Sequence, residues 1–215
     1  MTPHQPNQNA DPSQRVLVVF TRAPELGKVK TRLARRIGME AALKVHLSLL
    51  ENTLSRLCRT DRWITQLSYE GDLRRLQALP FVADSSVTFE QQRGSDLGGR
   101  MYHSIDTLVS LGKRVVLVGS DCPVFDTAYI ESAFQALESG LDVALGPAED
   151  GGYVLVGMRA GHKGVFMNID WGSKRVFAQT LERIQELGLT YLVLETLWDV
   201  DTQEDLRRYE ALCED

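Results

Sequence analysis

The sequence predicts a three-layer α/β fold around a mostly parallel sheet, and three observations support this class. Apolar runs without polar alternation recur along the chain, as in residues 16–20 and 115–119, and such runs are typical of strands buried on both faces. Segments with helical spacing of apolar residues alternate with these strands. No internal repeat or linker follows residue 15, so we expect one domain over 15–215 after a disordered polar tail over 1–14.

In the first half of the chain, strands are expected at 16–20, 63–69 and 87–91. A helix is expected at about 39–58, because leucines recur there at spacings of four and three, at Leu43, Leu47, Leu50, Leu54 and Leu57. A short helix over 72–79 is expected to end at Pro80.

In the second half, strands are expected at 115–119, 142–147, 154–157 and 190–194. Helices are expected at 97–111, 125–137 and 173–187, with a last one after residue 202. The residues expected to cap them are Ser95 or Asp96, Asp126 or Thr127, Ser173, and Thr202 in a capping box with Asp205.

Composition excludes several classes of protein. The 215 residues carry a net charge of -5, so no basic face for nucleic acid is expected. The three cysteines lie far apart, which favours a reduced cytoplasmic protein, and the four histidines form no zinc motif. No apolar run is long enough to span a membrane. The P-loop, dinucleotide-binding and nucleophile-elbow motifs are absent.

Four cations follow the first strand within eleven residues: Arg22, Lys28, Lys30 and Arg32. Ligands of open parallel sheets bind beyond the carboxyl ends of the strands, so this loop is expected to hold phosphate groups. A solvated basic turn is the alternative reading.

Glycines gather in the segment RGSDLGGRM, at Gly94, Gly98 and Gly99. Glycine allows the backbone to approach a ligand closely, but a plain glycine turn before a capped helix explains the segment equally well.

Acidic residues follow several of the predicted strands. Asp121 comes directly after the strand at 115–119, where a carboxylate suits Mg²⁺ or caps the following turn. Asp150 lies in a glycine turn and is expected to face the same site. Asp199 and Asp201 alternate across Val200, so both point the same way if the backbone is extended; from spacing alone, a surface pair before a helix is favoured.

Taken together, six segments resemble one known family. They are TRAPELGKVKTRL, RGSDLGGRM, GSDCP, EDGGYVLVG, a Trp-Gly-Ser loop and DVDTQEDL, and they span roughly residues 15 to 212. The chain resembles the uncharacterised glycosyltransferase-like family of the nucleotide-diphospho-sugar transferase superfamily, some members of which are named arsenosugar-biosynthesis glycosyltransferases. The KTRL and DVDTQEDL segments also resemble phospholactate guanylyltransferase.

The resemblance implies a glycosyltransferase-A fold with a nucleotide over the amino-terminal half of the sheet. It implies that phosphates are held by the loop residues Arg22, Gly27, Lys28, Lys30, Thr31 and Arg32. It places Gly94, Asp96, Gly98, Gly99 and Ser120 near the nucleotide. The metal, Mg²⁺ or Mn²⁺, is assigned to Asp121 with Asp199 and Asp201, because Gly119 replaces the first acid of the Asp-x-Asp motif frequent in this fold.

Three functions remain open at this point. The first is glycosyl transfer from a nucleotide-sugar to a small-molecule acceptor, and the second is nucleotidyl transfer from a nucleoside triphosphate to a phosphorylated metabolite. The third is nucleotide binding without turnover. For either reaction the expected catalytic residues are Lys30, Arg32, Asp121 and Asp150. The acceptor is expected near residues 150–153 and Trp171. The oligomeric state is not predicted.

Overall fold

The computed structural model describes residues 11–58, 61–83 and 85–214, and in this part of the chain seven strands form one sheet in the order β3-β2-β1-β4-β6-β5-β7. The strands are β1 Arg15–Arg22, β2 Ile64–Glu70, β3 Val87–Gln91, β4 Arg114–Gly119, β5 Val143–Pro147, β6 Tyr153–Met158 and β7 Tyr191–Val193. The α-helices are α1 Thr31–Ile37, α2 Met39–Leu57, α3 Leu73–Gln77, α4 Pro80–Ala83, α5 Leu97–Val109, α6 Thr127–Glu138, α7 Val176–Glu186 and α8 Gln203–Glu214. Two 3-10 helices, η1 Pro12–Gln14 and η2 Lys163–Phe166, complete the described elements.

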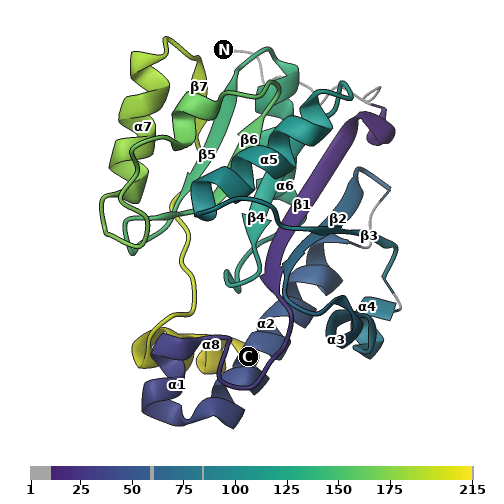
Figure 1. The fold of residues 1–215 in the computed structure, drawn as a ribbon, viewed down its shortest axis with the longest axis vertical. Coiled ribbons are helices and arrows are strands. Elements are labelled where there is room, and N and C mark those ends of the chain that lie inside the picture. Colours follow the sequence, from purple (N-terminus) through teal and green to yellow (C-terminus); the bar gives the residue numbers. More distant parts are fainter. Residues whose placement is uncertain (1–10, 59–60, 84, 215) are drawn as a thin grey trace.

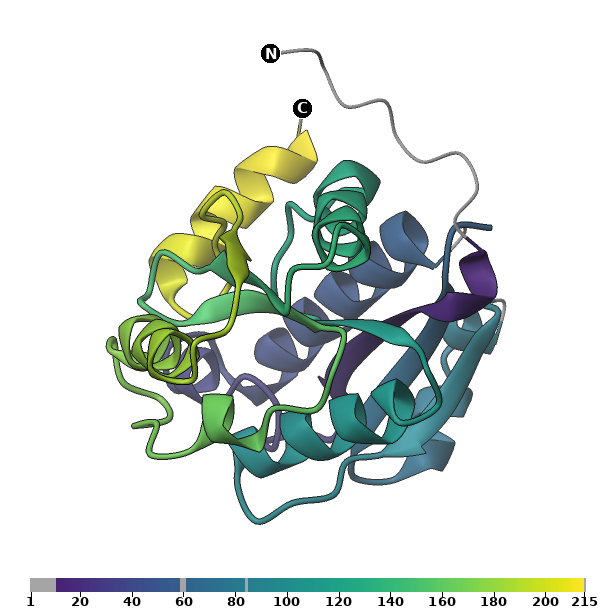
Figure 2. The same cartoon turned by 90° about the horizontal axis from the view of Figure 1, so that it is seen from above.

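Helices cover both faces of the sheet, which gives the three layers expected from the sequence (Figures 1 and 2). On one face α2 and α6 bury a core that includes Leu54, Phe134 and Leu17. On the other face α5, η2 and α7 bury a second core, with Ile105 and Ile184 among its members. The apolar strands are therefore buried on both sides, because each face has its own helical layer.

The sheet is mostly parallel, and β6 is the exception. β6 runs antiparallel to both of its neighbours, β4 and β5, and it follows β5 through a tight turn at residues 148–152. The parallel pairing of β1 with β2 and β4 brings the carboxyl ends of these three strands to one edge of the sheet. The loops that follow Arg22, Glu70 and Gly119 therefore meet there.

A third, smaller core forms below this edge, where α1, α2 and α8 come together (Figure 1). It contains Leu33 of α1, Leu49 of α2 and Tyr209 of α8. Trp198 and Val200 pack into the same core from the segment before α8. This cluster attaches the end of the chain to the loop that follows β1.

Several local expectations are confirmed. The side chains of Asp96 and Asp126 accept the backbone N–H of Gly99 and Tyr129 at 2.7 Å, so both aspartates cap their helices. The capping box before α8 forms as expected, since Thr202 and Asp205 bond each other's backbone N–H groups.

Other expectations are wrong. The loop after β1 ends at Lys30, and Thr31–Ile37 form a helix that the sequence reading missed because Gly38 interrupts the periodicity. Pro80 begins α4 instead of only ending the helix before it, since proline fits the first helical position. α7 begins at Val176, so Ser173 does not cap it; the Ser173 hydroxyl accepts from Arg175 N in the preceding turn.

The buried stripe of α2 also differs from the leucine pattern. Leu43 and Leu47 are only half-buried, whereas Ala42, His46 and Leu49 are buried. The buried face of α2 thus includes a polar residue, His46, which the spacing of the leucines does not reveal.

Residues 1–10 of the expected disordered tail lie outside the described residues, and Pro12–Gln14 form η1. Within the residues the structure covers, none of the helices combines the length and apolarity that crossing a bilayer requires.

Arg15 ties the first strand to α6. Its guanidinium donates to both oxygens of Glu138 at 2.7 Å and to Glu131 at 2.9 and 3.0 Å, and its side chain is 5% exposed. Replacing Arg15 by Met should lower the free energy of unfolding by about 2–4 kcal/mol, because two partly buried carboxylates lose their partner. Urea unfolding measures this loss, and Arg74→Met, which removes an 88%-exposed arginine, is the matched control. Equal losses in the two variants would contradict the role of Arg15.

Candidate active site

The candidate site lies at the edge of the sheet where β1 and β4 end. Lys30, at the end of the loop after β1, carries an unusual backbone, with φ 46° and ψ 43°. This left-handed conformation is uncommon for a residue with a side chain and clusters at functional positions. It directs the Lys30 side chain inward, where only 4% of it is exposed.

The Lys30 ammonium is held between two aspartates that come from distant parts of the sequence. Its Nζ lies 3.0 Å from Oδ1 of Asp121 and 3.3 Å from Oδ1 of Asp201. It also donates to the carbonyl oxygen of Val200 at 2.6 Å. Arg32 reaches the other oxygen of Asp201 at 3.7 Å, from the first turn of α1.

Burial lowers the pKa of the Lys30 ammonium, but the charges of Asp121 and Asp201 outweigh this effect and raise it overall. Lys30 is therefore a permanent cation at neutral pH. Because its side chain is almost fully buried, its position is much better defined than that of a surface lysine.

Backbone hydrogen bonds hold the two acidic segments against each other. Val200 N donates to the carbonyl oxygen of Asp121 at 3.1 Å. Glu149 N donates to the carbonyl oxygen of Leu197 at 2.9 Å, so the turn after β5 is joined to the same segment. The structure thus brings the loops carrying Asp121, Asp150 and Asp199 together, which sequence spacing cannot show.

Asp199 lies half-buried in this acidic surrounding. Burial and the charges of Asp150 and Asp201 raise the pKa of its carboxyl to about 7, although Lys30 opposes the shift. Asp121 raises it further. The site therefore holds more negative charge than the buried Lys30 compensates.

A divalent cation fits this donor set chemically. Carboxylate oxygens are the ligands that Mg²⁺ prefers, and a cation would relieve the crowding that raises the pKa of Asp199. Oδ1 of Asp121 is buried with the Lys30 ammonium as its neighbour. Across the described ranges, no three Asp, Glu, His or Cys residues are already arranged as a metal site. Metal binding by Asp121, Asp199 and Asp201 thus stays a prediction.

The other cations of the loop are paired at its surface. Lys28 is 71% exposed and lies 2.9 Å from Glu25. Arg22 and Arg100 both lie 3.0 Å from the same oxygen of Glu70. Two arginines that share one carboxylate leave a net positive charge at the ends of β1 and β2.

The glycine segment before α5 is shaped largely by its own packing. Gly94 has φ 150°, and a Cβ there would lie 2.6 Å from Arg100 N. A Cβ at Gly98 would lie 2.6 Å from the ring of Trp171. Gly99 is less constrained, with its nearest neighbour at 3.4 Å. Internal packing alone therefore accounts for glycine at positions 94 and 98. The expected contact of this segment, including Asp96, with the nucleotide remains a prediction.

The remaining expected residues have different surroundings. Thr31 is exposed at the start of α1, and Gly27 adopts φ 76° in the loop. The hydroxyl of Ser120 is buried and donates to Thr21 Oγ1 at 3.2 Å, between β4 and β1. Asp150 is exposed and accepts from Gly152 N at 2.7 Å.

Two aromatic rings lie in the region where the acceptor is expected. Tyr153 and Trp171 pack edge to face with their centroids 6.4 Å apart. Trp171 lies against Gly98, and Arg32 lies 4.0 Å from the position a Cβ would take on Gly172. The loop carrying Trp171 therefore lies between the cationic loop and the glycine segment.

His46 is a site residue that the sequence reading missed. It is buried on α2, and its Nε2 lies 3.0 Å from the carbonyl oxygen of Arg22, where β1 ends. Burial lowers the pKa of His46, although Asp121 opposes the shift. The one sequence feature that could have indicated His46 is its polar character among the apolar residues of this helix.

Comparison with known proteins identifies a family model and solved structures that are similar to this chain. The family model described as "Uncharacterized protein conserved in bacteria (DUF2064)" matches residues 53–173. A solved structure from Desulfovibrio desulfuricans G20, provisionally assigned as a nucleotide-diphospho-sugar transferase, is 34% identical with a TM-score of 0.82. The match covers 90% of this chain and 85% of that protein. A search of curated proteins gave no significant match.

More distant structures share the fold. The CMP:2-keto-3-deoxy-manno-octonic acid synthetase complexed with CTP is 13% identical, with a TM-score of 0.60 and coverage of 94% of this chain and 99% of that one. The 4-diphosphocytidyl-2C-methyl-D-erythritol synthase from Anaerococcus prevotii DSM 20548 is 10% identical, with a TM-score of 0.61 and coverage of 95% and 98%. The fold is thus that of the nucleotide-diphospho-sugar transferases, as the sequence resemblance implied.

The raised pKa of Asp199 predicts a pH dependence of stability. Between the ordinary value of 3.8 and about 7, the folded protein binds a proton that the unfolded chain has lost. The free energy of unfolding should therefore fall as pH rises through this window. His46, whose pKa is lowered, contributes the opposite slope, so the test compares wild type with Asp199→Asn. In urea unfolding from pH 5 to 8, the free energy of unfolding of the wild type should fall relative to that of Asp199→Asn as the pH rises. Parallel curves would contradict the assignment.

Proposed function

The chain belongs to the DUF2064 family, and we propose that it is a transferase acting on a nucleotide-activated substrate. The observation that carries the proposal is the buried Lys30 ammonium between Asp121 and Asp201, at the carboxyl ends of β1 and β4. The carboxylates that Lys30 holds at this edge suit a divalent cation, and such a cation suits a phosphate group of the substrate, because ligands of open α/β sheets bind there. The relative from Desulfovibrio desulfuricans supports a nucleotide-sugar as the donor.

Mg²⁺ or Mn²⁺ is the cofactor in this proposal, held by Asp121 and Asp199 with Asp201 beside them. Held by these carboxylates, the cation would supply positive charge to offset the negative charge of the leaving phosphate. Lys30 and Arg32 add fixed positive charge where the leaving phosphate gains negative charge. The contribution of Lys30 does not require reorganisation during the reaction, since its two aspartates already hold it in place.

In glycosyl transfer, the bond between the anomeric carbon of the sugar and the phosphate oxygen breaks, and the nucleoside diphosphate leaves. A hydroxyl of the small-molecule acceptor forms the new bond to the anomeric carbon. Asp150, exposed in the turn after β5, is our candidate to accept the hydroxyl proton. Tyr153 and Trp171 are proposed to position the acceptor, because their rings pack beside this turn.

Nucleotidyl transfer is the second candidate, favoured by the positive charge around Glu70. Arg22 and Arg100 share this one carboxylate, and a triphosphate has more negative charge to hold than a sugar diphosphate. In this reaction an oxygen of a phosphorylated acceptor attacks the α-phosphorus, and pyrophosphate leaves. The two distant synthases of the same fold include one solved with CTP.

A ligand panel distinguishes the two reactions. Thermal unfolding with Mg²⁺ and each of a set of nucleoside triphosphates and nucleotide-sugars should show stabilisation by one class, about 2.7 kcal/mol at a hundredfold excess over Kd. Selective stabilisation by a nucleotide-sugar, followed by release of nucleoside diphosphate with an acceptor, supports glycosyl transfer. Stabilisation by one triphosphate, with release of pyrophosphate, supports nucleotidyl transfer. No stabilisation by either class would count against the proposal.

Single substitutions test the residues. Asp121→Asn should abolish metal-dependent turnover, because it removes a proposed ligand of the cation. Lys30→Gln should reduce turnover by about tenfold to a thousandfold, because it removes a fixed positive charge from the site. Arg36→Gln removes an exposed cation from the last turn of α1 with the same change in net charge, and it is the matched control for Lys30→Gln. Circular dichroism checks that each variant folds. If the wild type has no turnover and nucleotide binds equally well to Asp121→Asn, the protein is a nucleotide-binding module instead.

A further inference from the structure

The two strands that flank the candidate site separate at their carboxyl ends. β1 and β4 pair in register as far as Phe20 opposite Gly119, and Ser120 N then donates to the carbonyl oxygen of Phe20 at 3.1 Å. β1 continues to Arg22, whereas the chain bends away from the sheet at Ser120. Because ladder bonds to one neighbouring strand recur at every second residue, the next acceptor for β4 would be the carbonyl oxygen of Arg22. Within the described residues, no strand amide bonds that oxygen.

His46 of α2 occupies the position that β4 leaves open. Its Nε2 lies 3.0 Å from the carbonyl oxygen of Arg22, and its side chain is buried. A carbonyl oxygen can only accept a hydrogen bond, so Nε2 carries the proton. The same peptide unit is held on its other side, where Ala23 N donates to the carbonyl oxygen of Glu70 at 2.7 Å. The last peptide unit of β1 is therefore bonded from both sides, by α2 and by β2, although β4 has ended.

The imidazole of His46 provides this hydrogen bond as a neutral group. Burial lowers the pKa of His46, and the charges of Lys30 and Arg22 act in the same direction, although Asp121 opposes them. With the proton on Nε2, the neutral ring has an unprotonated Nδ1. A neutral donor adds no charge to an edge where Lys30 already lies between Asp121 and Asp201.

Other polar side chains of α2 bond the loop on the far side of this opening. Asn52 Nδ2 donates to the carbonyl oxygen of Pro123 at 2.9 Å. The hydroxyl of the fully buried Thr53 makes a longer bond, at 3.5 Å, to the carbonyl oxygen of Ser120. Side chains of α2 therefore hold the backbone on both sides of the opening, since His46 bonds β1 while its helical neighbours bond the loop after β4.

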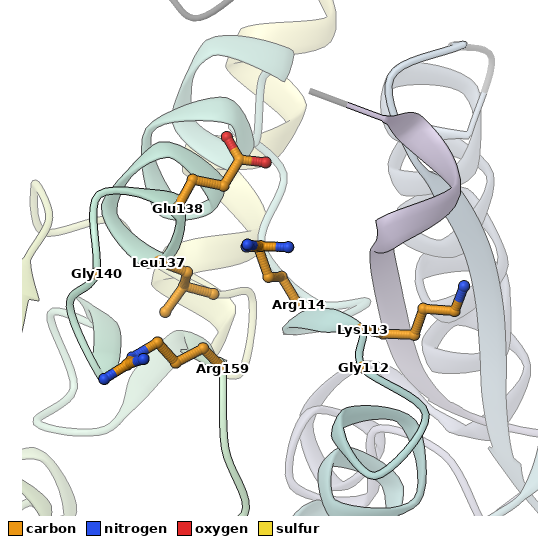
Figure 3. Close-up of a pocket in the computed structure, with 7 residues that line it drawn as sticks. All are labelled: Gly112, Lys113, Arg114, Leu137, Glu138, Gly140 and Arg159. Carbon is orange, nitrogen blue, oxygen red and sulfur yellow. The ribbon is translucent and has the colours of Figure 1, made fainter. Parts of the chain in front are cut away.

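At their amino ends, β1 and β4 stay together. Arg15 opposite Arg114 is the first pair of their ladder, and Arg114 borders a pocket of about 230 Å³ with Glu138 and Arg159 (Figure 3). Arg15 binds Glu138, and Arg159 binds Asp142, so carboxylates already lie beside the arginines of this end. The opening between the two strands is therefore confined to the end that carries the candidate site.

We propose that His46 is a positioning residue of the candidate site, whose Nε2–H replaces the strand amide that β4 does not supply to Arg22. It thereby fixes the end of β1 and the start of the loop that leads to Lys30. Ligands of open α/β sheets bind in the crevice where neighbouring strands part in this way. The expected effect on a ligand rests on the proposed function, whereas the hydrogen bond itself can be tested without any nucleotide.

The first test measures the hydrogen bond by NMR in the ¹⁵N-labelled full chain. Long-range proton–nitrogen spectra at pH 7.5, with His46 assigned through its own backbone, should show a neutral ring with the proton on Nε2. A bond to the carbonyl of a peptide unit also polarises its N–H group. The amide proton of Ala23 should therefore move upfield in His46→Leu and return towards its wild-type position in His46→Gln, whose carboxamide can donate to the same oxygen. A proton on Nδ1, or an unchanged Ala23 amide in His46→Leu, would overturn the proposal.

The second test measures binding of UDP-glucose and of CTP, each with Mg²⁺, by calorimetric titration. For the probe that the wild type binds, His46→Leu should raise Kd about tenfold, because the end of β1 loses a buried hydrogen bond that fixes its position. His46→Gln should restore most of the affinity. His103→Leu makes the same replacement at a half-buried histidine of α5, and it should leave Kd unchanged.

Urea unfolding of the same variants separates positioning from a purely structural role. If His46→Leu lowers the free energy of unfolding but leaves Kd as in the wild type, His46 only stabilises the fold and the proposal is overturned. Equal weakening of binding by His46→Leu and His46→Gln would also contradict it. If the wild type binds neither probe, that result counts against the proposed function, and the proton position and the Ala23 amide decide the role of His46.

Discussion

The structure of the candidate site depends on one buried cation. The Lys30 ammonium joins the loop after β1 to Asp121 after β4 and to Asp201 before α8. Removing a charged group of this kind from water is favourable only with partners of opposite charge in contact. The left-handed backbone at Lys30, the extended segment around Val200 and the packing of α8 all serve this arrangement. The carboxyl-terminal segment is thus part of the site, although it is more than 160 residues away in sequence.

The two edges of the sheet differ in the arrangement of their charged side chains. At the active-site edge, several carboxylates surround the buried Lys30 ammonium, and burial together with the neighbouring carboxylates raises the pKa of Asp199. At the opposite edge, Arg15, Arg114 and Arg159 lie in one row, and three carboxylates lie beside them, those of Glu131, Glu138 and Asp142. A partly buried carboxylate without a compensating charge is costly, which is a physical reason for the active-site edge to bind a cation.

The glycines and aromatic residues around the site have structural reasons of their own. Gly98 makes room for Trp171, and Trp171 in turn packs on Tyr153. This packing fixes the loop that lies beside Arg32. A segment that is shaped by internal packing can still border a ligand. Close packing at Gly94 and Gly98 is therefore compatible both with a plain glycine turn and with a nucleotide contact.

The sequence by itself determined the fold class, most of the strands and the caps at Asp96, Asp126 and Thr202, because these depend on local periodicity and on hydrogen bonds between near neighbours. It also selected the segments that the structure brings to one edge, since they follow strands in a parallel sheet. Only the tertiary structure decided which of their charges meet. The pairing of Lys30 with Asp121 and Asp201, the burial of His46 and the row of Arg15, Arg114 and Arg159 arise from contacts between segments far apart in sequence, and local spacing carries no information about them.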